Sequence, residues 1–94
     1  MLRITVHYTP AVGTLQVEGR LAGLWVSVLE ECWQEVRARD GTAVVRVDLR
    51  GLTSMDLAGR NCLAALHRQG AEFCADGLTA AVVAEITESS TTQA

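Results

Sequence analysis

The sequence contains no lysine, and its eight positive charges are arginines spread along 94 residues. The formal net charge is −3 at pH 7, and no basic stripe follows the chain that could track the phosphates of a nucleic acid. An acidic block and a basic amphipathic helix are also missing, which removes the usual means of attraction to a membrane surface. The composition therefore excludes nucleic acids and membranes as expected partners and leaves proteins and small molecules.

Long apolar runs are missing as well, so no segment is long enough to cross a bilayer. The first five residues lead directly into an alternating strand pattern, without the architecture of a signal peptide. Cysteine is rare: Cys32, Cys62 and Cys74 are an odd number with no Cys-x-x-Cys spacing, and we expect reduced thiols that fill the core. These features predict a cytoplasmic protein.

The hydrophobic fraction of 49% and the charged fraction of 20% are typical of a globular domain. A chain of 94 residues buries about 60 to 70% of its unfolded surface without metals or disulfides. We therefore expect one domain over residues 1–88, followed by a flexible tail over 89–94 whose Ser-Ser-Thr-Thr-Gln-Ala sequence has nothing to bury.

Alternation of apolar and polar residues predicts two strands early in the chain, over Arg3–Tyr8 and Thr14–Arg20, joined as a hairpin through Thr9–Gly13. A helix is predicted over Leu24–Val36, because apolar side chains recur there at three- and four-residue spacing. Its apolar face consists of Leu24, Trp25, Val28, Leu29, Cys32, Trp33 and Val36. Tryptophans at this spacing are typical core residues, and the ring nearer the edge of the face is the one open to partial exposure.

The centre of the sequence predicts a strand over Ala43–Leu49, in which alternate residues are apolar. A turn-like segment follows over Arg50–Met55. The next helix is predicted over Leu57–Gln69, with Asp56 as its N-cap and Gly70 as its stop.

A short strand over Ala71–Ala75 and a helix over Gly77–Ile86 complete the pattern. The order β, β, α, β, α, β, α predicts an α/β fold, with a mixed four-stranded sheet and about three helices mainly on one face. The strands keep polar residues on their other face, which we expect to be partly solvated or to meet a partner.

The junction between the central strand and its following helix is the expected working surface, because a loop that feeds a helix N-terminus concentrates unpaired backbone N–H groups. We expect a protein partner to dock there through Thr53, Ser54, Met55, Asp56, Leu57, Ala58, Gly59, Arg60 and Asn61. Two other readings stay open. Asp56 is also explained by helix capping alone, and the helix N-terminus could instead hold a small anion or a nucleotide.

Catalytic constellations are not evident. Ser54, Asp56 and His67 are the residue types of a hydrolytic triad, but His67 lies about 16 Å along the helix from its start. His7 and His67 are isolated, with no second ligand at metal spacing. A glycine-rich phosphate loop is also missing. The sequence therefore predicts no enzymatic activity, no metal and no cofactor.

Three segments stand in a distinctive order: LQVEGRL at 15–21, VRVDLRGLTSMDLAG at 45–59 after a long helix, and GAEF at 70–73. The most specific positions are Asp48, Leu49, Thr53, Asp56 and Gly59. In order and spacing these residues resemble the STAS family, the sulfate transporter and anti-sigma factor antagonist domain. The resemblance spans most of the chain and implies a protein-binding surface at the helix start.

The bacterial antagonists of the STAS family typically read Asp-Ser-Ser-Gly or Asp-Ser-Thr-Gly in this loop, and a kinase partner phosphorylates the hydroxyl residue directly before the glycine. Asp56 and Gly59 match that pattern here, but Leu57 and Ala58 occupy the two hydroxyl positions. Since alanine cannot be phosphorylated, the family's usual switch does not carry over to this chain.

Two hypotheses for control follow from this departure. Either the chain binds its partner constitutively, or a neighbouring hydroxyl, Ser54 or Thr53, has taken over the switch. The resemblance implies an anti-sigma factor or serine kinase as the partner, in bacterial regulation of transcription. STAS domains also accompany transporters, so a regulatory subunit that binds an ABC-type transporter ATPase is the alternative. A second copy of the chain could also cover the open sheet face, which would make a homodimer.

Overall fold

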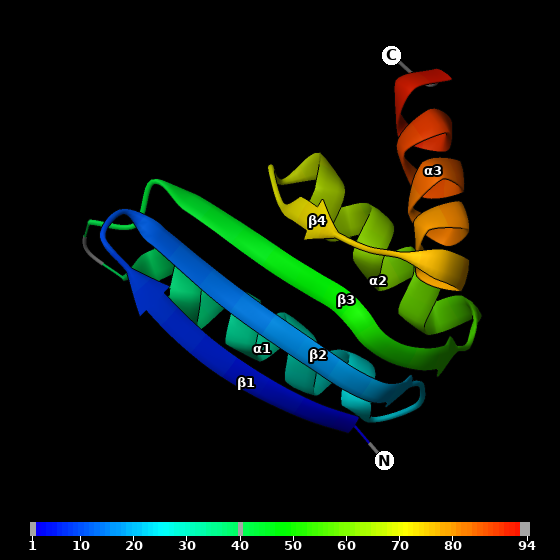
Figure 1. The fold of residues 1–94 in the computed structure, drawn as a ribbon, viewed down its shortest axis with the longest axis horizontal. Coiled ribbons are helices and arrows are strands. Elements are labelled where there is room, and N and C mark those ends of the chain that lie inside the picture. The colour runs from blue at the N-terminus through cyan, green and yellow to red at the C-terminus, as the bar shows by residue number, and fades with distance from the viewer. Residues whose placement is uncertain (1, 40, 93–94) are drawn as a thin grey trace.

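The computed structural model describes residues 2–39 and 41–92. Its elements are β1 (Leu2–Thr9), β2 (Val12–Leu21), α1 (Trp25–Ala38), β3 (Val44–Met55), α2 (Leu57–Arg68), β4 (Glu72–Cys74) and α3 (Gly77–Thr92). The strands form one sheet in the order β1-β2-β3-β4, with β1 antiparallel to β2 and the other two pairs parallel. Figure 1 shows α1 and α2 behind this sheet and α3 beside α2. The predicted α/β fold, with its mixed four-stranded sheet, is confirmed.

The hydrophobic core lies between the sheet and the helices. Leu15 and Val17 of β2 and Val47 of β3 point into it and are fully buried, as their alternating pattern predicts. Trp33 of α1 is 2% exposed, and its indole N–H donates to Gln69 Oε1 at 3.1 Å. At about 1.5–3 kcal/mol for each large side chain buried, this face of α1 is a main source of stability.

The three cysteines are free thiols. Cys62 is buried, which confirms its predicted role in the core, and burial raises the pKa of its thiol to about 12. Cys32 and Cys74 are only half-buried.

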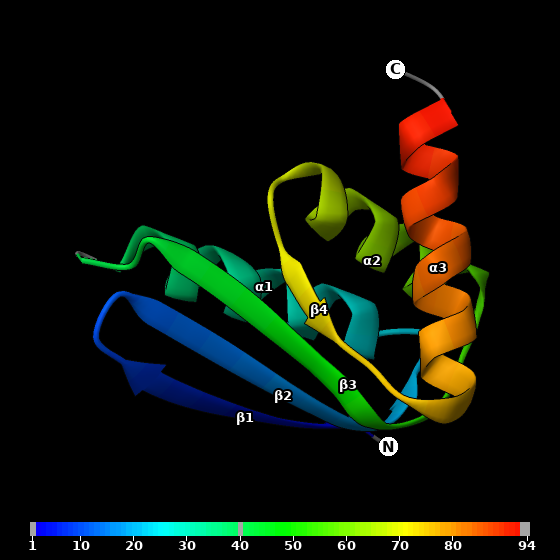
Figure 2. The same ribbon diagram turned by 45° about the horizontal axis from the view of Figure 1, so that its top comes forward.

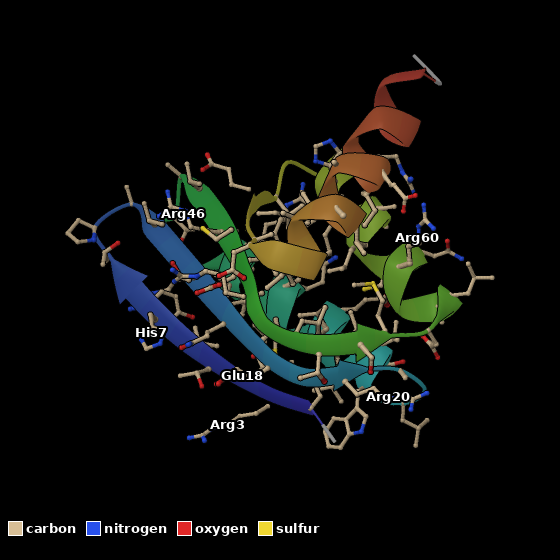
Figure 3. The ribbon with its side chains drawn as sticks, turned by 45° about the vertical axis from the view of Figure 1, so that its right-hand side comes forward. Arg3, His7, Glu18, Arg20, Arg46 and Arg60 are labelled. Carbon is tan, nitrogen blue, oxygen red and sulfur yellow. The ribbon has the colours of Figure 1, made fainter. Side chains whose placement is uncertain are left out.

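The sheet face opposite the helices is polar. Figure 2 shows the helices on one side of the sheet, and no other part of the described chain covers the second side. Arg3 stands opposite Glu18 there, and His7 Nε2 lies 3.2 Å from Gln16 Oε1. Figure 3 shows Arg3 and His7 projecting from β1 and Glu18 from the neighbouring β2. The prediction of a polar face is therefore confirmed.

Asp48 of β3 is the one buried charged residue among those described, with 7% of its surface exposed. Its two carboxylate oxygens accept hydrogen bonds from Arg50 Nε at 3.0 Å and from Arg50 Nη2 at 2.8 Å. The backbone N–H of Arg50 donates to the same carboxylate at 3.0 Å. These bonds satisfy the charge of Asp48 on the polar face of the sheet, and they hold the pKa of Asp48 below its ordinary value.

The prediction of a turn-like segment over Arg50–Met55 is wrong, because β3 continues as a strand through all of these residues. The polar and glycine residues of this segment suggested a turn. The segment instead pairs with β2 as far as Leu21, with two register shifts in the pairing. Leu52 is buried, and the Thr53 hydroxyl donates to the Gly19 carbonyl oxygen at 2.9 Å. The strand therefore delivers the chain directly to Asp56.

The last helix is longer than predicted, since α3 runs to Thr92 rather than ending at Ile86. No glycine or proline follows Ile86 to stop it. Ile86 itself is buried against the core, and Val82 and Val83 pack beside it. The flexibility of residues 89–94 stays a prediction, and residues 93 and 94 lie outside the described residues.

Candidate functional site

Asp56 is the N-cap of α2, as the sequence predicts, and its carboxylate holds two parts of the chain together. Oδ1 accepts the backbone N–H of Gly59 at 2.7 Å in the first turn of α2. Oδ2 accepts the backbone N–H of Gly23, in the loop before α1, at 3.1 Å. These two bonds, the one from Gly59 first, hold the pKa of Asp56 below its ordinary value, so the group is a carboxylate at neutral pH.

The starts of α1 and α2 are consequently neighbours. The backbone N–H of Asp56 also donates to the Leu21 carbonyl oxygen at 3.2 Å, which fixes the end of β3 against the end of β2. Gly59 fits this close approach because a Cβ at its position would collide with that same carbonyl oxygen. A glycine is thus required at the helix start for packing, independently of any partner.

Two large apolar side chains stand in solvent at this junction. Leu57, the first residue of α2, is 73% exposed, and Leu24, the residue before α1, is 87% exposed. The expectation that Leu24 belongs to the buried face of α1 is wrong, and Trp25 and Val28 of that predicted face are also exposed, each at 38%. Leu24 is the N-cap and precedes the first helical turn, so the phase of the helix does not bring its side chain to the sheet.

The residues predicted for partner binding divide into three groups. Asp56 and Arg60 are half-buried, and both hold other parts of the chain through their side chains. Met55 is half-buried against the core and Gly59 is buried, so both shape the site from inside. The exposed ones are Thr53, Ser54, Leu57, Ala58 and Asn61. With Leu24 added, which sequence reasoning missed, we call Leu24, Thr53, Ser54, Leu57, Ala58 and Asn61 the docking surface.

Arginines border the docking surface. Arg60, in the first turns of α2, pairs with Glu85 of α3 at 3.3 Å. Arg20, near the end of β2, stands opposite Ser54 in the parallel register of β2 and β3. Figure 3 shows Arg20 and Arg60 on these two elements. Charged side chains therefore occupy positions next to residues of the docking surface, as polar residues border the apolar centre of a protein interface.

His67 lies in the last turn of α2, at the opposite end of the helix from Asp56, and its ring stacks on Phe73 of β4 with centroids 6.0 Å apart. No helix within residues 2–39 and 41–92 combines the length and hydrophobicity needed to cross a bilayer.

The sequence matches no protein-family model and no curated protein. Solved structures do resemble the fold. An anti-sigma factor antagonist from Mycobacterium paratuberculosis superposes with a TM-score of 0.76 at 20% identity, over 98% of this chain and 82% of that one. A STAS-domain antisigma-factor antagonist from Rhodobacter sphaeroides gives 0.54 at 19% identity, over 83% and 88%.

The anti-sigma factor antagonist SpoIIAA, in its unphosphorylated form, gives a TM-score of 0.58 at 13% identity. The match covers 71% of this chain but 62% of SpoIIAA, so the chain spans less than two thirds of that protein. The order of the strands and the three helices agree with these proteins. The chain therefore has the STAS fold of the anti-sigma factor antagonists.

Proposed function

We propose that the chain is a non-catalytic regulatory module that binds a protein partner through the docking surface, as a bacterial anti-sigma factor antagonist does. The main support is the exposure of Leu24 and Leu57 beside the Asp56 carboxylate that joins their two loops. Large apolar side chains held on a rigid, polar-rimmed surface are typical of residues that bury against a partner.

The alternative of a small anion at the start of α2 is disfavoured by the cap itself. The Asp56 carboxylate already accepts the Gly59 N–H and adds a negative charge where an anion would have to lie. A protein partner that covers the exposed leucines does not meet this repulsion.

The partner we propose is an anti-sigma factor or serine kinase, in the cytoplasm of a bacterium. The STAS fold supports this class of partner, and three free thiols fit a reducing compartment. A regulatory subunit of a transporter ATPase is the second candidate, which rests on the resemblance to STAS domains alone.

We further propose that binding is constitutive. Ala58 is exposed in the first turn of α2, one residue before Gly59, where the family's phosphorylated hydroxyl would stand. A phosphate there would add a charge of about −1.5 to −2 beside Asp56. Since alanine cannot accept it, the apolar surface of Leu24 and Leu57 stays available.

The test is a pull-down from the native cell with wild-type protein and Leu57→Arg as baits. Asp56 is a poor choice for this test, because its carboxylate also holds the fold together. Ala43→Arg is the matched control, since Ala43 is exposed near the start of β3, at the other end of that strand. An anti-sigma factor or serine kinase that binds the wild type and the control but not Leu57→Arg is the expected result.

A transporter subunit recovered in the same pattern would support the second candidate instead. Equal recovery with all three baits would show that the docking surface is wrong. Incubation with the recovered kinase and ATP, followed by mass spectrometry, tests the control mechanism. Phosphate at Ser54 or Thr53 would contradict constitutive binding.

A further inference from the structure

The outer edge of β1 is the least protected part of the sheet. β1 is eight residues long, contains no proline, and pairs with β2 without a register shift. The other edge strand, β4, has only three residues. Natural proteins usually blunt an edge with short strands, bulges, prolines or charges, because an open edge can pair with another strand. In β1 the formal charge is limited to Arg3, so its edge is open.

The backbone groups that face this edge belong to the apolar residues of β1. Thr9 and Val12 close a two-residue hairpin loop, and such a closing pair is hydrogen-bonded. Because hydrogen-bonded and non-hydrogen-bonded pairs alternate, Ile4, Val6 and Tyr8 direct their N–H and C=O groups away from β2. Their side chains lie on the helix side of the sheet, as the register of Val6 with the buried Leu15 shows.

The helix layer leaves these side chains partly uncovered. α1 packs against β2 and β3, and Val6 and Tyr8 on the neighbouring β1 remain 38% and 44% exposed. The guanidinium carbon of Arg39, at the end of α1, lies 3.7 Å from the centroid of the Tyr8 ring. This contact identifies the flank of α1 that faces β1.

The same flank of α1 presents two more apolar side chains. Val28 precedes Arg39 by about three helical turns, and Trp25 lies about one turn before Val28, so all three share this side. Trp25 and Val28 are each 38% exposed. Four of the six large hydrophobic side chains that are exposed in the described residues therefore gather along the β1 side of the molecule: Val6, Tyr8, Trp25 and Val28. We call these four residues the edge surface.

We propose that the edge surface binds a second copy of the chain, with the two β1 strands antiparallel across a two-fold axis at Val6. The two sheets then form one continuous eight-stranded sheet, and the axis keeps the helices of both copies on the same side. This register places Ile4 of one copy opposite Tyr8 of the other, and Thr5 opposite His7. Arg3 stands opposite Thr9, so no like charges meet.

Self-complementarity favours a second copy over an unrelated strand. In a two-fold symmetric interface every pair of residues occurs twice, so each residue of the strand must suit the residue that it faces. Around Val6, β1 forms apolar pairs on the helix side of the sheet and polar pairs on the open side. A register centred on Thr5 would place Arg3 opposite His7, which is less favourable. One strand edge and four partly exposed apolar side chains from each copy make a small interface, so we expect a reversible dimer that dissociates in the micromolar range.

Sedimentation equilibrium of the full chain between about 1 and 300 μM tests the proposal, since this range brackets a micromolar dissociation constant. We expect a concentration-dependent dimer for the wild type. Val6→Arg places two guanidinium groups together on the axis, and we expect it to raise the dissociation constant at least about 100-fold. Val6 is already part-exposed, and circular dichroism checks that the variant is folded.

Leu57→Arg is the matched control, because it makes the same kind of change on the docking surface. We expect it to dimerise as the wild type does and to lose the proposed partner, whereas Val6→Arg should show the reverse. The dimer and the partner-binding function can therefore be contradicted independently of each other. A wild type that remains monomeric throughout, or a Val6→Arg variant that dimerises normally, would overturn the dimer.

The register is tested with Val6→Cys. Opposed residues of a hydrogen-bonded antiparallel pair have Cα atoms about 5.5 Å apart, within the span of a disulfide. Mild oxidation should link position 6 of one copy to position 6 of the other, as peptide mapping by mass spectrometry would show. Thr9→Cys, which faces Arg3 in this register, should not link to itself. A dimer without the disulfide at position 6 would overturn the proposed axis.

Discussion

Gly23 donates its backbone N–H to the Asp56 carboxylate at 3.1 Å, across 33 positions of sequence. The same carboxylate caps α2 through Gly59. One side chain thus sets the position of both helix starts, and of the exposed leucines beside them. These bonds hold the backbone beside both exposed leucines in place before a partner binds, which reduces the ordering cost of binding.

Replacement of the Asp56 carboxylate should lower stability by an amount that depends on how many acceptor oxygens remain. Asp56→Ala leaves the N–H groups of Gly23 and Gly59 without their acceptor, and Asp56→Asn keeps a single acceptor oxygen for them. We expect the midpoint of urea unfolding, monitored by circular dichroism, to be lower for Asp56→Asn than for the wild type and lower still for Asp56→Ala. Glu31→Ala, an exposed change on α1, is the control. Equal midpoints for the two Asp56 variants would contradict the double role.

Stability should also fall in acid. The Arg50 side chain holds the pKa of Asp48 below its ordinary value, and backbone N–H groups do the same for Asp56. A carboxylate whose pKa is lower in the folded state stabilises the fold above its unfolded pKa of about 3.9, and this stabilisation is lost as the pH falls through the folded value.

We therefore expect the free energy of unfolding to decrease below about pH 5, as measured by urea unfolding at a series of pH values. The double variant Asp48→Asn and Asp56→Asn should be less stable at neutral pH and should show a shallower decrease in acid. An unchanged slope would show that other groups cause the acid sensitivity.

Gly59→Ala should destabilise the fold by about 1–3 kcal/mol, the usual range for overpacking. The added Cβ would collide with the Leu21 carbonyl oxygen and lie 3.0 Å from the Leu21 side chain, and backbone cannot move aside easily. Gly51→Ala is the comparison. Its Cβ would lie 2.7 Å from Glu18 Cγ, but that side chain can rotate away, so we expect a smaller loss. Urea unfolding of both variants measures the difference, and a larger loss at Gly51 would contradict this explanation.

Local patterns predicted much of this molecule. The N-cap at Asp56 follows from the residue types at a helix start, because the bond to Gly59 spans only three residues. The buried face of β3 follows from the alternation of Val45, Val47 and Leu49. Such features depend on neighbours in the sequence, and the sequence displays them directly.

The missed features depend on distant partners. The Arg50–Met55 segment is a strand because β2 pairs with it, and the Gly23 bond to Asp56 joins residues that no local pattern connects. Leu24 continues the apolar spacing of α1, yet its place before the first turn removes it from the buried face. Helix ends and parallel pairing are thus the two places where periodicity alone failed.

Ala58→Glu should weaken partner binding without lowering the stability of the fold. A carboxylate in the first turn of α2 interacts favourably with the helix dipole, by about 0.3–1 kcal/mol, and repulsion from Asp56 offsets part of that gain. We therefore expect the urea midpoint to stay the same or to rise slightly. The added charge would have to be buried with Leu57 when the partner docks, so the dissociation constant for the partner should rise at least about tenfold.

Isothermal titration calorimetry with the partner recovered in the pull-down measures this effect. Ala58→Gln, which has the same size and no charge, is the control that separates charge from bulk. Equal weakening by Glu and Gln would show that Ala58 is selected for its small size rather than for its lack of charge, since steric exclusion alone would then explain the loss. Weakening by Glu alone would show that the surface around Leu57 excludes negative charge, which is the property that a phosphorylated residue at this position would exploit.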